Sequence, residues 1–186
     1  MTGYRLTRRH LFVLTLGGVL TARAALAESA SVPRSHGPSS REIVRYDGGE
    51  PAGTILISNK GRTLLRVLGK GRAERYRISV GREGFTWVGT TYVGRKEEWP
   101  GWRPPSEMRQ RDASLPDYVP PGPYNPLGAR ALYLYSGGSD TLYRIHGTNS
   151  SATLGGYETS GCFRLSNADV LELFGKVAIG TKVIVR

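Results

Sequence analysis

The chain has 186 residues, a formal net charge of +11, 25 glycines and a single cysteine. This length allows one domain with a substantial core and is too short for two domains of ordinary size. A basic surface can meet nucleic acid, anionic lipid or a carboxylate-rich polymer, but long blocks of Lys and Arg are absent from the sequence. We therefore expect most of the charge to be solvated surface rather than a nucleic-acid site.

The first 27 residues have the three-part plan of an export signal. A basic stretch, Arg5 to Arg9, precedes the apolar run Leu11 to Leu20, and Ala25-Leu26-Ala27 resembles a small-residue cleavage site. The apolar run is about half of the roughly twenty residues that cross a bilayer. Thr7 to Phe12 resembles the twin-arginine signal, with an ordinary secretory signal as the alternative. We expect residues 1–27 to be removed, the mature protein to have no transmembrane segment, and nucleic acid to be excluded as a partner.

Residues 28–50 are polar and rich in Ser, Gly and Pro, which predicts a flexible tether. From Gly53 onward, short aliphatic and β-branched runs alternate with turn residues, the pattern of a β-meander. The expected strands in this half are 54–58, 63–68, 73–80 and 85–93. The folded domain is therefore expected to occupy residues 51–186 and to begin with β-structure.

The segment between Gly94 and Gly128 contains eight of the eleven prolines. So many prolines cannot join central strands. Long irregular segments are functional lids or surface excursions packed by their own aromatics, and Trp99, Trp102 and Tyr124 suit both. We expect an ordered lid loop, with the surface excursion as the alternative.

Regular structure is expected to resume after the proline-rich segment, with strands at 129–135, 141–146 and 182–185. Between the last two, Ser166 can cap a short helix, Asp169 suits its positive end, and Gly175 can close it. The sequence therefore predicts a mainly β domain with one short helix.

Cys162 has no cysteine to pair with, so its thiol is either a small buried hydrophobe or a reactive group. Thiol chemistry needs a base, and His146 is the only histidine inside the expected domain, because His10 lies in the leader and His36 in the tether. His146 ends an expected strand, and the Gly-rich stretch 147–156 can fold back to bring imidazole and thiol together. One Cys and one usable His fall short of a metal site, so neither metal nor cofactor is expected.

The neighbours of Cys162 suit an acyl-transfer site. Gly161 has no side chain to obstruct a substrate carbonyl, and the N–H groups of Gly161 and Cys162 are candidate oxyanion donors. Arg164 lies on the same face if the segment is extended, where it can hold a carboxylate or lock the loop. The orienting acceptor for His146 is expected to be a backbone carbonyl, with Gly147 the nearest.

At these residues the sequence resembles the L,D-transpeptidase catalytic domain, the YkuD-like family of bacterial cell-wall enzymes. The resemblance rests on His146-Gly147-Thr148 and on Thr159-Ser160-Gly161-Cys162-Phe163-Arg164, in the family's order and spacing. It extends through 95–100, 104–108 and 125–132, and covers roughly residues 50–186. Ser160 stands where some members have a second histidine, which leaves His146 as the sole base.

The resemblance implies the family's β-sandwich or barrel fold, with a helix after the catalytic cysteine and a long proline-rich lid. It implies that Cys162 is the nucleophile and His146 its base and acid. The other implied residues are Gly161, Ser160 and Gly147 for oxyanion binding or support, and Arg164, Thr159, Trp99 and Tyr124 for substrate binding.

The implied activity is transpeptidation in the periplasm, in cell-wall synthesis and the maintenance of cell shape. Cys162 would attack a peptidoglycan tetrapeptide stem, release D-alanine and pass the diaminopimelate carbonyl to an amine. That amine belongs to another stem, giving a 3-3 cross-link, or to an outer-membrane protein. The alternatives are an L,D-carboxypeptidase, which uses water, and a catalytically silent peptidoglycan-binding protein with a buried cysteine.

Overall fold

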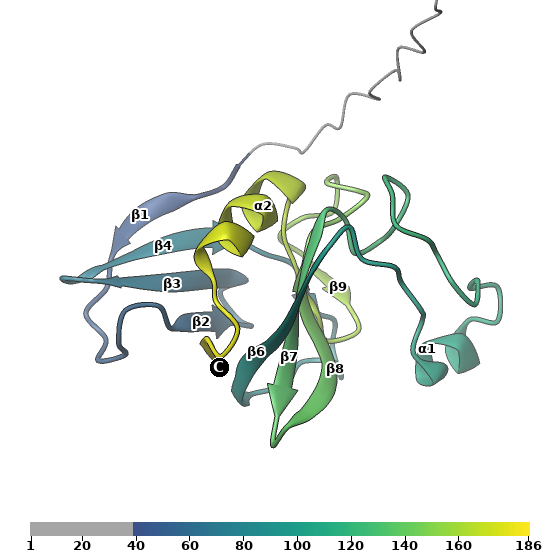
Figure 1. Ribbon diagram of the computed structural model, residues 1–186, viewed down its shortest axis with the longest axis horizontal. Helices are drawn as coiled ribbons and strands as arrows, with labels where there is room; N and C mark the ends of the chain where they lie inside the picture. Colours follow the sequence, from purple (N-terminus) through teal and green to yellow (C-terminus); the bar gives the residue numbers. More distant parts are fainter. Residues whose placement is uncertain (1–38) are drawn as a thin grey trace, which may run out of the picture. The chain divides into compact units, whose positions relative to one another are not determined.

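The computed structural model describes residues 39–186 (Figure 1), so the expected leader, 1–27, and positions 28–38 of the expected tether lie outside the described residues. The described part is mainly β, as the sequence predicts. The elements in chain order are β1 (Glu42–Arg45), β2 (Ile55–Ser58), β3 (Thr63–Gly69), β4 (Arg72–Arg77), β5 (Val80–Gly81), β6 (Gly89–Glu98), α1 (Ser106–Arg111), β7 (Arg130–Ser136), β8 (Ser139–His146), β9 (Tyr157–Thr159), β10 (Phe163–Arg164), α2 (Asn167–Lys176) and β11 (Lys182–Val185).

Nine of the strands form one sheet in the order β1-β4-β3-β2-β11-β6-β7-β8-β10, and β5 pairs with β9. The large sheet curls back on itself, because Ser79, just after β4, forms backbone hydrogen bonds with β10, the strand at the opposite edge of the sheet. The Ser79 N–H donates to the Arg164 carbonyl at 2.8 Å, and the Arg164 N–H donates to the Ser79 carbonyl at 3.0 Å. The expected barrel-like β-domain is thereby formed.

The core lies between the curled sheet and α2. Val170 and Leu173 of α2 are fully buried, as are Tyr76 of β4 and Phe163 of β10. Figure 1 shows α2 lying against the sheet, and it contacts β7. Burying these large apolar side chains is the main driving force for the fold.

The N-terminal end of α2 agrees with its sequence pattern, and the C-terminal end does not. Ser166 Oγ accepts a hydrogen bond from the Asp169 N–H at 3.0 Å, the capping contact that the sequence predicts. Gly175, expected to close the helix, lies inside it, and α2 continues to Lys176. The Lys176 ammonium bonds to Glu74 and Glu172, which stabilises the additional residue as helix.

The expectation of a flexible tether is wrong for residues 39–50. Glu42–Arg45 forms β1, an edge strand antiparallel to β4. Just before it, Ser39 and Ser40 hydroxyls donate to the Asp169 carboxylate of α2 at 2.8 and 2.7 Å. The small polar residues that suggested disorder instead find partners at a helix start, which sequence composition does not reveal.

The proline-rich segment is shorter and more regular than expected. Strand β6 runs to Glu98, and the segment contains the second helix of the described residues, α1, so the expectation of a single helix is wrong. Pro105 directly precedes α1, where proline suits the start of a helix. Trp102 and Val119 exchange backbone hydrogen bonds of 2.9 and 2.8 Å across the segment.

Neither α1 nor α2, the helices of residues 39–186, is long and apolar enough to cross a bilayer.

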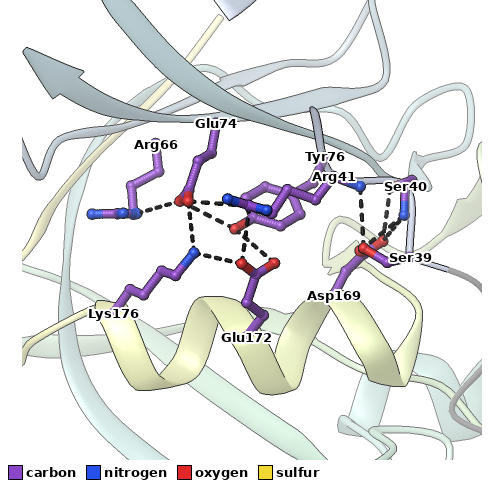
Figure 2. Close-up of polar contacts among 9 residues, drawn as sticks. All are labelled: Ser39, Ser40, Arg41, Arg66, Glu74, Tyr76, Asp169, Glu172 and Lys176. Carbon is purple, nitrogen blue, oxygen red and sulfur yellow. Dashed lines mark hydrogen bonds and ion pairs between the residues drawn. The ribbon is translucent and has the colours of Figure 1, made fainter. Parts of the chain in front are cut away.

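A buried ion cluster holds α2 to the N-terminal strands (Figure 2). Glu74 of β4 is 3% exposed, and its carboxylate meets Arg66 at 2.8 Å, Lys176 at 2.6 Å and Arg41 at 3.1 Å. Glu172 of α2 also pairs with Arg41, at 2.9 Å. Burial opposes ionisation of Glu74, but hydrogen bonds from the three cations outweigh it and lower its pKa to about 2.

Candidate active site

Parallel pairing of β8 and β10 brings the segments that carry the expected nucleophile and base side by side. Phe163 lies beside Ile145, and Arg164 beside His146. Phe163 and Ile145 are both fully buried, so their side chains face the core. Because side chains alternate along a strand, Arg164 and His146 project from the other face, and Cys162 directly precedes β10. The fifteen residues between His146 and Cys162 are thus folded so that the segments that carry the two reactive groups lie side by side.

The Cys162 thiol is partly buried and donates to the Leu142 carbonyl at 3.8 Å. Leu142 has φ 63°, a left-handed conformation that is unusual for a branched residue and common at functional sites. Burial raises the pKa of the Cys162 thiol, whereas the backbone N–H and the charge of Arg144 lower it. The thiol is therefore protonated at neutral pH and needs a base.

His146 has the protonation state that a base requires. Its ring Nδ1 lies 2.7 Å from the Gly147 carbonyl oxygen, the acceptor that the sequence predicts. A carbonyl oxygen only accepts, so Nδ1 carries the proton and the lone pair lies on Nε2. The side chain is buried, which lowers the His146 pKa to about 4, and the charges of Arg164 and Arg144 act in the same direction. The imidazole is neutral at pH 7 and can accept a proton through Nε2.

The thiol bonds to the Leu142 carbonyl rather than to the imidazole in this structure. Catalytic hydrogen bonds are often long or poorly aligned until substrate binds. Rotation of the Cys162 side chain to another staggered rotamer changes the direction in which its thiol points.

The turn before the nucleophile is shaped by Thr159. Its hydroxyl donates to the Cys162 carbonyl at 2.6 Å and accepts from the Gly161 N–H at 3.2 Å. Gly161 has φ 109°, and a Cβ there would lie 2.5 Å from the Tyr143 ring, so only glycine fits. Thr159, expected to bind substrate, is used by the backbone instead, and the Gly161 N–H, expected in the oxyanion hole, bonds to Thr159.

Sequence reasoning missed Trp87, which holds the same turn through a hydrogen bond to Gly161. Its indole N–H donates to the Gly161 carbonyl at 3.0 Å. The ring stacks on Tyr143 with centroids 4.5 Å apart and also contacts Phe163, at 5.6 Å. The residue lies in a stretch expected to be a strand, and nothing in the local pattern distinguished it from an ordinary core aromatic.

Arg164 binds the loop that joins His146 to Cys162. One terminal nitrogen donates to Thr153 Oγ1 at 2.7 Å and to the Thr153 carbonyl at 3.2 Å, and lies 3.5 Å from Ser79 Oγ. Its Nε is buried and has no hydrogen-bond partner among residues 39–186. The guanidinium therefore has both a contact that locks the loop and an unused donor.

Asn167, the first residue of α2, also acts on the base and was not expected from the sequence. Its side-chain oxygen accepts from the N–H groups of Ala129 and Thr148, at 2.9 and 3.1 Å, and its amide donates to the Thr148 carbonyl at 2.7 Å. A Cβ on Gly147 would lie 2.2 Å from this oxygen. Gly147 thus allows the helix to clamp the segment whose carbonyl orients His146. The only local signal was a polar residue directly after the helix cap.

The proline-rich segment reaches the same region. Arg111 of α1 donates to Ser160 Oγ at 3.4 Å, and its guanidinium lies 4.8 Å from the Phe85 ring centroid. The Tyr124 ring is 86% exposed, and its carbonyl accepts from Asn149 Nδ2 at 3.0 Å.

The remaining expected substrate residue lies beside the start of β7. Trp99 is partly buried, and its N–H donates to the Ala129 carbonyl at 2.8 Å. Residues 39–186 contain no cluster of three or more His, Cys, Asp or Glu that could hold a metal ion. The chemistry available at this face is attack by a thiol, assisted by a neutral imidazole, on an electrophilic carbonyl.

The sequence also matches known proteins. The model of the YkuD family, described as the L,D-transpeptidase catalytic domain, matches residues 52–185. The chain is 41% identical over 118 residues to the probable L,D-transpeptidase ErfK/SrfK of Escherichia coli and 44% identical over 114 residues to the probable L,D-transpeptidase YbiS of the same species. These matches cover 59% and 57% of this chain but only 36% and 35% of the relatives' lengths. A putative L,D-transpeptidase of Bacillus subtilis, YqjB, is 31% identical, with 73% of this chain and 72% of the relative covered.

Solved structures share the fold. A Brucella melitensis protein described as a probable carnitine operon oxidoreductase is 40% identical, with a TM-score of 0.55, and the match covers 82% of this chain and 98% of that one. L,D-transpeptidase 3 of Mycobacterium tuberculosis is 21% identical, with a TM-score of 0.53, over 73% of this chain and 61% of that one. The family model spans most of the chain, and the chain belongs to the L,D-transpeptidase catalytic-domain family.

Proposed function

We propose that this protein is a cysteine transpeptidase of the cell wall, acting on peptidoglycan tetrapeptide stems through a thioester on Cys162. The observation that carries the proposal is the parallel pairing of β8, which ends at His146, with β10, which begins one residue after Cys162. Family membership supports the reaction class. The proposed location is the periplasm, which the leader-like residues 1–27 support.

The first half of the reaction follows from the protonation states. His146 Nε2 takes the proton of the Cys162 thiol as the sulfur attacks the carbonyl of diaminopimelate, and a C–S bond forms. The C–N bond to the terminal D-alanine then breaks, and the imidazolium returns the proton to the leaving amine. The products are a thioester and free D-alanine.

The second half regenerates the thiol. An amine attacks the thioester carbonyl and loses a proton to His146 Nε2, the C–S bond breaks, and the proton passes to the Cys162 thiolate. The Cys162 N–H is the proposed oxyanion donor in both halves. A donor of this kind contributes about 3 kcal/mol to stabilising a tetrahedral intermediate.

The proline-rich segment is proposed to form one wall of the substrate cleft. The Arg111 contact with Ser160 brings it within 3.4 Å of a residue two positions before the nucleophile. Tyr124 and Trp99 lie on the same segment and are proposed to contact the stem peptide. The unused Nε of Arg164 is proposed to meet a substrate carboxylate once the stem is bound.

The test is incubation of the protein with tetrapeptide-bearing muropeptides, with the product masses read directly. Wild type should release D-alanine, and Cys162→Ala should release none while unfolding at the wild-type temperature. Arg72→Gln, an exposed change on β4 away from the thiol, is the matched control and should keep wild-type activity. Release of D-alanine by Cys162→Ala at the wild-type rate would refute the proposal.

The same masses identify the acceptor. A joined pair of stems indicates a 3-3 cross-link, a stem on a lysine-containing peptide indicates protein anchoring, and a free tripeptide indicates an L,D-carboxypeptidase. A carbapenem serves as an independent probe, since a catalytic domain from Enterococcus faecium is described as acylated by ertapenem. An ertapenem adduct on Cys162 would exclude the silent binding protein, and an inert thiol would favour it.

A further inference from the structure

A pocket of about 240 Å³ lies between β1, the β2–β3 turn, β4 and the loop that precedes β9. Three of its lining residues are arginines, Arg62, Arg75 and Arg77, and one is a carboxylate, Glu42. Neither Cys162 nor His146 lines this pocket, and the proposed reaction uses none of these four side chains.

Strand alternation explains why the arginines gather there. On β4, Glu74 and Tyr76 are buried toward α2 (Figure 2), so the residues between and after them, Arg75 and Arg77, face the opposite side of the sheet. The register places Glu42 beside Arg75 and Thr63 beside Arg77. Strand residues therefore supply Glu42, Arg75 and Arg77 to the pocket, and the β2–β3 turn supplies Arg62.

The charges in the pocket are not balanced. Glu42 accepts two hydrogen bonds from Arg75, at 2.9 and 2.7 Å, which uses the one lining carboxylate. Within the described part of the chain, Arg62 and Arg77 form no ion pair with Asp or Glu. Two arginine side chains therefore line one small pocket without an ion-pair partner among residues 39–186.

The backbone holds Arg62 in place. It has φ 50°, and its carbonyl accepts from the Ile78 N–H at 2.9 Å, which ties the β2–β3 turn to the end of β4. The Arg62 guanidinium also lies 5.2 Å from the Tyr157 ring centroid. A donor held by two such contacts loses less conformational entropy when it binds an anion.

The pocket adjoins the loop that joins the catalytic residues. A Cβ on Gly155 would lie 2.1 Å from Arg77 Nε, so the guanidinium packs directly on this glycine. The Gly155 N–H donates to Ser79 Oγ at 3.0 Å, and Arg164 reaches the same oxygen at 3.5 Å. A group bound to Arg77 would thus lie against the loop that Arg164 also contacts, at Thr153.

We propose that this pocket is a second binding site, for a carboxylate or phosphate oxyanion of the cell-wall polymer. Two guanidinium groups can each offer a pair of parallel N–H donors, which matches the oxygens of either anion. The choice of the wall polymer as the source rests on the proposed function, whereas the oxyanion chemistry rests on the pocket alone. The site would hold a wall strand beside the loop between His146 and Cys162.

The test is a ¹H–¹⁵N NMR titration of the full-length Cys162→Ala protein, in which no turnover can occur. One arm uses inorganic phosphate, and the other uses a disaccharide tripeptide stem that ends in diaminopimelate and has no D-alanine to lose. Both are expected to shift the backbone amides of Gly61, Thr63 and Gly155, which line the pocket. The arm with the lower Kd identifies phosphate or carboxylate as the preferred source.

Variants of opposite expected sign make the test sharp. Arg62→Gln and Arg77→Gln should each weaken the Kd of the preferred probe about tenfold, because each removes a charge-assisted donor. Glu42→Gln should tighten it, because Arg75 is then free to join. Arg72→Gln removes the same charge from β4 outside the pocket. It should change the Kd less than about twofold, because salt screens an exposed surface charge.

The proposal is overturned if neither probe shifts these three amides, or if Arg62→Gln, Arg77→Gln and Arg72→Gln weaken binding equally. The outcome is independent of the reaction. A wild-type protein that releases no D-alanine while its Cys162→Ala variant shows the expected shifts would refute the proposed function and support this site. Normal D-alanine release by wild type, without the expected amide shifts in Cys162→Ala, would support the proposed function and refute this site.

Discussion

At the scale of single residues, burial decides the chemistry of the candidate site. A solvated histidine and cysteine would titrate near their ordinary values, but both groups lie where the charged form is poorly solvated. The His146 pKa falls and the Cys162 pKa rises, so the resting pair is neutral. The geometry favours general-base activation of a thiol over a preformed thiolate and imidazolium pair.

The first prediction concerns the titration of His146. Its imidazole should titrate near pH 4 instead of 6.5, because protonation would place a charge in a buried site next to Arg164 and Arg144. The measurement is the pH dependence of its ring proton shift by NMR, with His146→Gln to assign the signal. A midpoint near 6.5 would contradict the neutral-base mechanism.

The same shift affects stability. A pKa lower in the folded than in the unfolded state gives stability that is complete above pH 6.5 and lost as the pH falls toward 4. The loss should reach about 3 kcal/mol, from 1.36 kcal/mol for each pKa unit. Urea unfolding across this range should show the loss in wild type and little of it in His146→Gln, which has no group to protonate at this position.

At the scale of elements, the start of α2 holds the segment that orients His146. It also follows directly after β10, the strand next to Cys162. Asn167 holds the N–H groups of Ala129 and Thr148 and the Thr148 carbonyl. The Gly147 carbonyl that orients His146 lies in the same short segment. The helix, the end of β8 and the start of β7 are thereby fixed to one another at a single amide side chain.

The second prediction is that Asn167→Ala lowers kcat for D-alanine release by ten- to a hundredfold, with KM little changed. The reason is that a misplaced base costs rate on the order of a hundredfold, even when substrate still binds. Asn167→Asp keeps the acceptor for the two N–H groups and should recover part of the loss. A folded Asn167→Ala with wild-type kcat would show that the clamp is structural only.

At the scale of the whole domain, the Glu74 cluster joins the N-terminal edge to the helix behind the active site. Its partners come from the segment before β1, from β3 and from α2, so one buried carboxylate connects parts of the chain more than a hundred residues apart. The cluster lies on the inner side of β4, and the arginine pocket lies on the outer side of the same strand.

The third prediction is that Glu74→Gln lowers the free energy of unfolding by about 3 kcal/mol at pH 7, because it leaves three cations beside a neutral buried group. The Glu74 pKa is lowered in the folded state, so this contribution is present above pH 4.5 and disappears as the pH falls toward 2. Denaturant unfolding of wild type and Glu74→Gln at pH 7 and at about pH 2 measures this contribution to the free energy of unfolding.

The matched control is Glu42→Gln, which breaks an exposed ion pair with Arg75 and should cost less than about 1 kcal/mol. Equal losses for the two variants at pH 7 would show that burial gives the Glu74 cluster no special weight.

Much of the fold follows from local pattern alone. The period-two runs, the glycine turns and the Ser166 cap indicated most strands and α2, because these features depend on neighbours in the sequence. The boundaries that failed were decided by distant partners. Residues 39–45 are ordered by α2 and β4, and Gly175 is helical because Lys176 bonds to Glu74.

For the site, the sequence alone predicted which residues carry the chemistry, because one thiol and one histidine remained in a motif of known order. Only the tertiary structure decided their state. The parallel register of β8 and β10, the burial that shifts both pKa values, and the clamps by Thr159, Trp87 and Asn167 all depend on contacts between distant segments. The arginine pocket is the same case, since its charged side chains converge only when β1, the β2–β3 turn and β4 meet. Chemical identity is local, whereas solvation and orientation are set by whatever the fold brings alongside.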